Sequence, residues 1–211
     1  MLKGIMTGQH EGFLGGVYGA KDASAVASLY DKWAATYDAE MAKAGYRHPS
    51  IALALLARHL PKGAAPLLDA GAGTGLIGDW LAIMGYPRVE ALDISEGMLA
   101  VARAKGCYSA YHCLALGGRL PFADGHFAGV ISAGVFTTGH VGPEGLDELV
   151  RICARGGVIV LTVKGTLWDG GFSAHVAKDK RLRLAELTEP YVSMPGEAAT
   201  TPSRGVVLRV V

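Results

Sequence analysis

Hydrophobic positions in the chain follow two rhythms, one helical and one typical of buried strands. From residue 24 to 44, apolar and aromatic side chains recur at helical spacing, which predicts an amphipathic helix interrupted near Trp33. Pro49 suits the first turn of a second helix, which Pro61 and Gly63 end. After that point short apolar runs alternate with helical stretches. This alternation predicts a mostly parallel sheet covered by helices on both faces.

The predicted sheet occupies the second part of the chain. We expect strands at 65–70, 89–92, 108–114, 127–132 and 157–163, and helices at 76–84, 95–105 and 143–154. A helix at 172–187 and strands at 190–194 and 205–210 are expected to follow, with an antiparallel hairpin at the sheet edge. The predicted organisation is therefore a flexible tail at 1–22, a helical cap at 23–63 and one α/β domain at 64–211.

Composition narrows the class of protein. The 211 residues suffice for one domain with a core, and half of them are hydrophobic. Twenty basic and nineteen acidic residues give a net charge of +1, which does not favour nucleic-acid binding. Three cysteines without C-x-x-C spacing, and no apolar run of about 20 residues, favour a cytoplasmic protein that does not enter the membrane. Composition leaves the oligomeric state open.

A glycine-rich turn joins the first predicted strand of the sheet to its helix. The run LLDAGAGTG at residues 67–75 lets the backbone bend sharply, and the following helix directs free N–H groups at a ligand. Asp93 ends the next strand about 20 residues later, where a carboxylate can accept hydrogen bonds from ribose. Together these features predict a nucleotide-type site. The alternative interpretation is a structural turn, with Asp93 as a helix cap.

Two classes of cofactor use such a turn. Dinucleotides favour G-x-G-x-x-G, whereas this chain has G-x-G-x-G and places Leu76 where the third glycine would stand. No tyrosine is followed four residues later by lysine, so the usual pair of short-chain dehydrogenases is missing. The sequence therefore favours a single nucleoside over NAD.

Four segments resemble the class I S-adenosylmethionine-dependent methyltransferases. They are LLDAGAGTG, ALDISEGML, LPFADGHFAGVISAG and LDELVRICARGGVIVLTV. Within that class, YDKWAATYD at 30–38 and GHV at 139–141 are similar to the Williams–Beuren-region methyltransferase-like proteins. The resemblance covers the chain from about Tyr30 onward. It implies a Rossmann-like class I methyltransferase fold, with a seven-stranded sheet in the order 3-2-1-4-5-7-6 and an antiparallel seventh strand.

The resemblance also implies which residues bind S-adenosylmethionine. The turn residues are Asp69, Ala70, Gly71, Ala72, Gly73 and Thr74, of which Asp69, Ala70, Gly71 and Gly73 line the methionine end. Asp93 would hold the ribose, Ile94 and Met98 the adenine, the Ala115–Leu116 backbone its amino edge, and Ser132, Ala133 and Gly134 the sulfonium. The helix that carries Tyr30, Trp33 and Tyr37 would close over the cofactor. Their alternative role is core packing, because helical spacing signals only burial.

The chain departs from the family pattern at three positions. Ala115 replaces an acid that commonly accepts the adenine amine, so a backbone carbonyl or a water must do so. Ala128 replaces an aspartate, and Arg155 replaces the proline of a turn before the fifth strand. These changes concern the adenine end of the site and leave the methionine and ribose contacts intact.

Methyl transfer needs alignment of nucleophile, methyl and sulfur, and needs a base only if the acceptor is still protonated. His140 is the candidate base; alternatively it is a loop histidine that caps the next helix. Trp168 and Asp169 form either a substrate wall or a pinned turn. No acid pair follows strand 127–132 to hold Mg²⁺, so no metal is expected.

Three functions remain open. The first is a methyltransferase that acts on a small molecule and releases S-adenosylhomocysteine. The second is a protein or RNA methyltransferase, although the basic cluster at 178–183 is typical of a solvated helix face. The third is a cofactor-binding protein without transferase activity.

Overall fold

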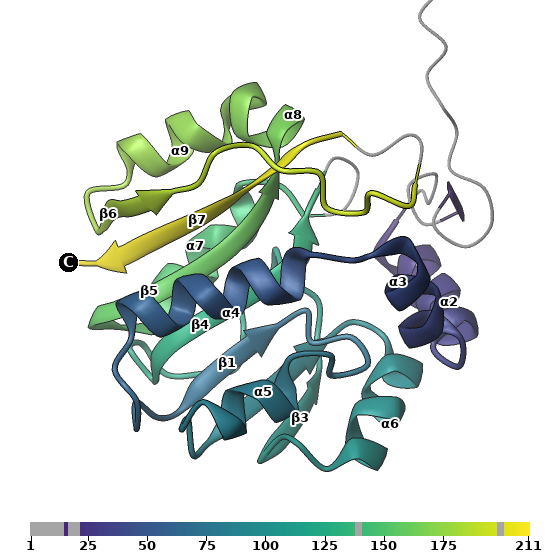
Figure 1. The fold of residues 1–211 in the computed structure, drawn as a ribbon. Coiled ribbons are helices and arrows are strands. Elements are labelled where there is room, and N and C mark those ends of the chain that lie inside the picture. Colours follow the sequence, from purple (N-terminus) through teal and green to yellow (C-terminus); the bar gives the residue numbers. More distant parts are fainter. Residues whose placement is uncertain (1–14, 17–21, 138–140, 198–200) are drawn as a thin grey trace, which may run out of the picture.

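A seven-stranded mixed sheet forms the centre of the computed structural model, which describes residues 15–16, 22–137, 141–197 and 201–211 (Figure 1). Its order is β3-β2-β1-β4-β5-β7-β6. The parallel strands are β1 (Leu67–Ala70), β2 (Val89–Asp93), β3 (Ala110–Cys113), β4 (Phe127–Phe136) and β5 (Cys153–Lys164). β7 (Ser203–Val210) runs antiparallel to both β5 and β6 (Leu182–Leu187). The expected α/β fold, strand order and antiparallel edge hairpin are confirmed.

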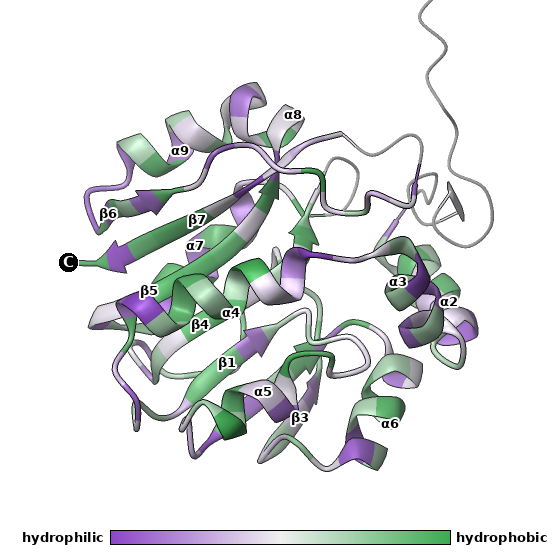
Figure 2. Cartoon of the chain, in the orientation of Figure 1, coloured by the Kyte–Doolittle hydropathy of each residue, from purple (hydrophilic) through white to green (hydrophobic). Residues whose placement is uncertain are grey.

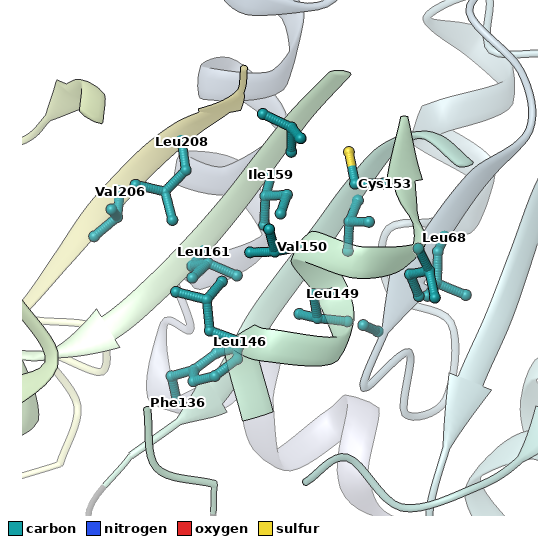
Figure 3. Packing of buried hydrophobic residues seen from close by; sticks show 14 of the residues in the cluster. Leu68, Phe136, Leu146, Leu149, Val150, Cys153, Ile159, Leu161, Val206 and Leu208 are labelled. Carbon is teal, nitrogen blue, oxygen red and sulfur yellow. The ribbon is translucent and has the colours of Figure 1, made fainter. Parts of the chain in front are cut away.

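Helices cover both faces of the sheet, because successive side chains of a strand point to opposite faces. One face carries α4 (His48–His59), α5 (Gly78–Ile83) and α6 (Glu96–Lys105), and the other carries α7 (Glu144–Ile152) and α9 (Ser173–Lys178). In β5, Val160 belongs to the core on the α4 face of the sheet. Leu161 belongs to the core on the opposite face, together with Leu149 of α7 (Figure 3). The central strands are accordingly hydrophobic along most of their length (Figure 2).

Two short helices form a cap at one end of the sheet, next to α6 (Figure 1). These are α2 (Ala23–Trp33) and α3 (Tyr37–Ala44), and the predicted interruption near Trp33 falls between them. α2 begins at Asp22, whose side chain accepts a hydrogen bond from the Ala25 N–H at 2.9 Å. Trp33 and Met98 of α6 belong to one buried cluster, which anchors the cap to the sheet domain.

The region before β7 differs from the prediction. The helix expected at 172–187 is wrong in its second half, because residues 182–187 form strand β6. Before it lie α8 (Gly165–Leu167), a segment kinked at Gly171 (Trp168–Phe172) and α9. Leu182 and Leu184 are two positions apart, which is the spacing of one face of a strand. So short a pattern identifies a strand only when the partner strand β7 is known. The strand expected at 190–194 is reduced to one bridge between Tyr191 and Ser203.

None of the helices in the described part of the chain is both long enough and apolar enough to cross a bilayer.

Candidate functional site

The carboxyl ends of β1, β2 and β4 and the cap helices enclose a cavity of about 300 Å³. Eleven of the residues expected to bind a cofactor line it: Tyr30, Tyr37, Gly71, Gly73, Asp93, Ile94, Met98, Ala115, Leu116, Ala133 and Gly134. In a parallel sheet the crevice beyond the strand ends is where ligands bind. The cavity therefore lies where the topology predicts a ligand site.

The turn after β1 is shaped by glycines that no other residue can replace without strain. Gly71 has φ +83°, and a Cβ there would lie 2.1 Å from Val135 Cγ2, well inside van der Waals contact. Gly73 has φ +55°, but no atom lies within 4 Å of the place its Cβ would take. At Gly73 the backbone thus faces open space in the cavity, as a ligand that approaches the backbone closely requires.

Asp93 joins this turn to β2. Its Oδ2 accepts a hydrogen bond from the Gly73 N–H at 2.8 Å, and its Oδ1 accepts one from the Ser95 N–H at 2.9 Å. Burial raises the pKa of the Asp93 carboxyl, whereas these two N–H donors favour the charged form. A carboxylate has about four acceptor positions, so these donors leave capacity for a ligand hydroxyl. The side chain is thereby held in place before any ligand arrives.

Apolar side chains form one end of the cavity beside Asp93. They belong to the residues that follow β2 and β3 and to the start of α6: Ile94, Met98, Leu114, Ala115 and Leu116. The Leu114 N–H donates to the Asp93 carbonyl at 2.9 Å, which fixes the segment next to β2. A flat heteroaromatic ring would fit such an apolar slot, and the backbone of Ala115 and Leu116 lies along it.

A smaller recess of about 30 Å³ lies on the other side of the turn. Asp69, Ala72 and Thr74 line it. The Tyr108 hydroxyl donates to Asp69 Oδ2 at 2.6 Å. Burial raises the pKa of Asp69 to about 7, and the charge of Asp93 adds to that shift while the Tyr108 bond opposes it. Near neutral pH the protonated and ionised forms of Asp69 are therefore both populated.

Three of the expected cofactor residues do not line either space. Trp33 is 2% exposed, and its Nε1 donates to Glu40 Oε2 at 2.9 Å. Ser132 donates through Oγ to the Ala70 carbonyl at 2.6 Å, and both residues are fully buried. Trp33, Ser132 and the Ala70 backbone thus hold the walls of the site together. Tyr30 and Tyr37 of the same cap face the cavity, and burial raises the pKa of Tyr37 well above its usual value.

Two aspartates that the sequence interpretation overlooked hold the cap in place. Asp31 Oδ1 accepts hydrogen bonds from Ser95 Oγ at 2.6 Å and from the Gly97 N–H at 2.8 Å. Asp38 accepts one from the Thr74 hydroxyl and pairs with Lys105 Nζ at 2.6 Å. Both acids stand in the segment 30–38, where their spacing beside the aromatic residues was the available signal.

The remaining candidates lie elsewhere. His140 is outside the described residues, although its neighbour Val141 lines the cavity. Trp168 is buried in the core against Phe172, and Asp169 is exposed, so this loop is a pinned turn away from the cavity. Within the described part of the chain, no three His, Cys, Asp or Glu side chains are grouped closely enough to hold a metal ion.

Comparison with known proteins agrees with this geometry. Residues 68–161 match the family described as a methyltransferase domain. The chain is 33% identical to Methyltransferase-like protein 27 of Homo sapiens over 150 residues, 70% of this chain and 61% of that protein. It is 35% identical to a malonyl-[acyl-carrier protein] O-methyltransferase of Serratia marcescens over 140 residues, 65% of this chain and 52% of that protein. The chain thus spans less than two thirds of the length of either relative.

A solved structure shows the same fold. A TehB-like SAM-dependent methyltransferase of Corynebacterium glutamicum superposes with a TM-score of 0.63 at 22% identity, over 87% of this chain and all of that one. The likeness to Methyltransferase-like protein 27 confirms the resemblance seen in the motifs. Residues 68–161 therefore match a methyltransferase domain in sequence, and the chain has the fold of an S-adenosylmethionine-dependent methyltransferase.

Proposed function

We propose that this protein binds S-adenosylmethionine in the 300 Å³ cavity and transfers its methyl group, without a metal ion, to a small-molecule acceptor. The observation that carries the proposal is Asp93, whose carboxylate is fixed by the Gly73 N–H while it lines the cavity. The ribose would bind there, the adenine in the apolar slot and the methionine part toward the recess of Asp69. The open space at Gly73 accommodates the ligand where a side chain would block it.

The bound cofactor supplies an electrophilic methyl group on a sulfonium. The residues of this chain align the reactants and exclude water, and such orientation contributes up to about 7–11 kcal/mol to lowering a barrier. Val26 of α2, Val135 and Val141 make the cap side of the cavity apolar. An acceptor with an apolar body therefore fits this side, and we propose His140, which precedes Val141 in the sequence, as the group that takes its proton.

A small acceptor is favoured because α2 and α3 cover the cavity. Hydrogen bonds of Asp31 and Asp38 hold these two helices in place. The second candidate is an acceptor on a macromolecule, either protein or RNA. The Serratia relative is named for a malonyl group carried on a protein. The two differ in one respect that can be measured, which is the size of the methylated product.

Cofactor binding is tested by calorimetry with S-adenosylmethionine, S-adenosylhomocysteine and NAD. We expect the first two to bind and NAD not to bind. The Asp93→Ala variant should weaken the binding of S-adenosylmethionine and S-adenosylhomocysteine by about 1–3 kcal/mol, since it removes a charge-assisted pair of hydrogen bonds to the ligand. Asp79→Asn, an exposed acid of α5, is the matched control and should bind normally. NAD binding alone, or unchanged affinity in Asp93→Ala, would contradict the proposal.

The acceptor class is tested with methyl-labelled cofactor and cell extract separated by size. Label in the small-molecule fraction supports the proposal, and label in protein or RNA supports the second candidate. Label in neither fraction, with tight cofactor binding, indicates a binding protein without transferase activity. His140→Ala tests the base: its transfer rate should fall furthest below wild type at neutral and alkaline pH, because a histidine can take a proton only when its imidazole is neutral. An unchanged rate would remove His140 from that role.

A further inference from the structure

A group of polar side chains lies against the cavity wall at Gly134, outside every motif of the sequence. We call it the Tyr46 cluster, which consists of Tyr46, His48, Lys164 and Tyr191. Its members come from the connection between α3 and α4, the start of α4, the end of β5 and the segment before β7. Three of the four side chains are wholly or partly buried rings that contact one another, and Tyr191 is distant from the other two in the sequence.

Tyr46 occupies the junction between the two spaces of the site. It lines both the large cavity and the small recess, together with Tyr37 and the glycine turn. A Cβ on Gly134 would lie 1.9 Å from the Tyr46 hydroxyl oxygen, so the hydroxyl fills the place that a side chain there would take. Gly134, whose φ of +82° already favours glycine, thus leaves room for the Tyr46 hydroxyl.

The other members of the cluster hold the Tyr46 ring. His48 meets it edge to face at 5.3 Å between ring centroids, and the His48 Nδ1 is hydrogen-bonded to the Tyr191 hydroxyl at 2.7 Å. Burial, with the charge of Lys164, lowers the pKa of His48 to about 3, so its imidazole stays neutral at ordinary pH. A neutral, fixed ring is suited to positioning its neighbour.

The backbone on each side of Tyr46 is also tied down. The Arg47 N–H donates to the Ser193 carbonyl at 2.8 Å, and the Gly196 N–H donates to the Ala44 carbonyl at 3.0 Å. The segment 191–196 thus clasps the turn that carries Tyr46. Such preorganisation is typical of a side chain that must meet a ligand atom at a fixed place.

We propose that the Tyr46 hydroxyl oxygen contacts the methyl-bearing sulfonium of the bound cofactor and gives the site its preference for the sulfonium over the thioether. The inference rests on the proposed function. In S-adenosylmethionine the sulfur joins the nucleoside to the amino acid, and Tyr46 stands where the nucleoside space meets the recess of Asp69. The positive charge is shared by the methyl group, which makes its C–H bonds donors to an oxygen.

A second aromatic residue strengthens the same preference. Tyr37 lines this junction too, and an aromatic face attracts a cation within about 6 Å of its centroid. After transfer the product is a neutral thioether, so both attractions are lost. The cluster thereby binds the reactant more tightly than the product and favours product release.

The test is the ratio of affinities for S-adenosylmethionine and S-adenosylhomocysteine, measured by calorimetry on the full chain. Tyr46→Phe keeps the ring and removes the oxygen. We expect it to lower the affinity for S-adenosylmethionine about two- to fivefold, the strength of a weak C–H hydrogen bond, and to leave S-adenosylhomocysteine unchanged. Tyr111→Phe, in β3 and outside the cavity lining, is the matched control and should leave the ratio unchanged.

Tyr191→Phe separates positioning from contact. It removes the hydrogen bond to His48 but lies outside the cavity lining, so we expect a smaller shift of the ratio in the same direction. An unchanged ratio in Tyr46→Phe, or an equal loss for both ligands, would overturn the inference while the proposed function stands. Failure of the wild-type protein to bind either ligand would instead overturn the proposed function.

Discussion

Asp69 shows how burial changes the chemistry of a single carboxyl group. It is 1% exposed and hydrogen-bonded to Tyr108, and its pKa is raised to about 7. The cofactor carries an ammonium group at its methionine end, which we place toward this recess. Ionisation of Asp69 therefore favours the proposed ligand and disfavours the folded state without it.

The sign of the pH dependence follows from that shift. Because the folded-state pKa of Asp69 lies above its value of 3.8 in the unfolded chain, its contribution to stability is complete below about pH 4 and is lost as pH rises through about 7. Asp69→Asn keeps an acceptor for Tyr108 and cannot ionise. We expect urea unfolding of the ligand-free protein to show wild type losing stability relative to Asp69→Asn between pH 4 and 7.

Asp79→Asn, again on the surface of α5, provides the control for this series. A constant difference in free energy of unfolding between wild type and Asp69→Asn across that range would mean that Asp69 titrates as it does in the unfolded chain.

How far the site could be predicted depends on the sequence distance between its parts. Gly73 and Asp93 are bonded to each other and only 20 positions apart, and one βαβ unit fixes both, so the motif sufficed. Helical spacing indicated that Trp33 and Tyr37 are buried but not which of them faces a ligand. Tyr46 could not be found, because its position depends on a contact between His48 and Tyr191, 143 residues apart.

At the scale of elements, the cap is joined to the sheet domain through few polar contacts. Asp31 is the main link between α2 and α6, and Gly97 lets the helices approach so closely that a Cβ there would lie 2.8 Å from the Asp31 Cα. Because the polar contacts lie at the surface and only one small cluster is buried beneath the cap, the cap should open more easily than the sheet cores. Such opening is the route by which a ligand can enter a covered cavity.

Asp31→Ala should weaken the attachment of α2 to α6. It removes two hydrogen bonds, each worth about 0.5–1.5 kcal/mol, so we expect faster hydrogen exchange in α2 and a severalfold weaker affinity for S-adenosylhomocysteine. Exchange in the sheet strands should not change. Lys32→Ala, an exposed neighbour on the same helix, is the control. Equal exchange in α2 of Asp31→Ala and wild type would show that apolar packing alone holds the cap.

Elements with a strong internal period were predicted well, and those that depend on a partner were not. The helix expected at 143–154 is α7, because Leu146, Leu149 and Val150 mark one face that meets the sheet (Figure 3). Strand β6 escaped prediction since its six residues alternate only weakly, and their structure comes from pairing with β7. Local sequence carries the first kind of information and lacks the second.

At the scale of the whole molecule, β7 connects both cores. Val207 packs on the face of α4, whereas Val206 and Leu208 pack on the face of α7. Gly205 lets α4 lie close, since a Cβ there would be 2.5 Å from Leu55 Cδ1. The strand therefore couples the two layers, and a destabilising substitution in it should lower the stability of both cores.

Leu208→Ala tests this coupling. Leu208 is fully buried, and truncation of a buried leucine costs about 2–5 kcal/mol. We expect that loss in the free energy of unfolding, with one cooperative transition in which both faces unfold together. Val211→Ala, at an exposed site beyond the strand, should change stability little. Two separate transitions in Leu208→Ala would show that the layers unfold independently.

The insertion of β7 between β5 and β6 also sets an order of assembly. Among the described strands, β6 is paired with β7 alone, yet the ribosome completes β6 first. A nascent chain therefore exposes the unpaired edge of β5 and an unpaired β6 until β7 is synthesised and pairs with both. Pairing that must wait for distant segments is slow and open to aggregation. We therefore expect this half of the sheet to be the part most open to aggregation during synthesis.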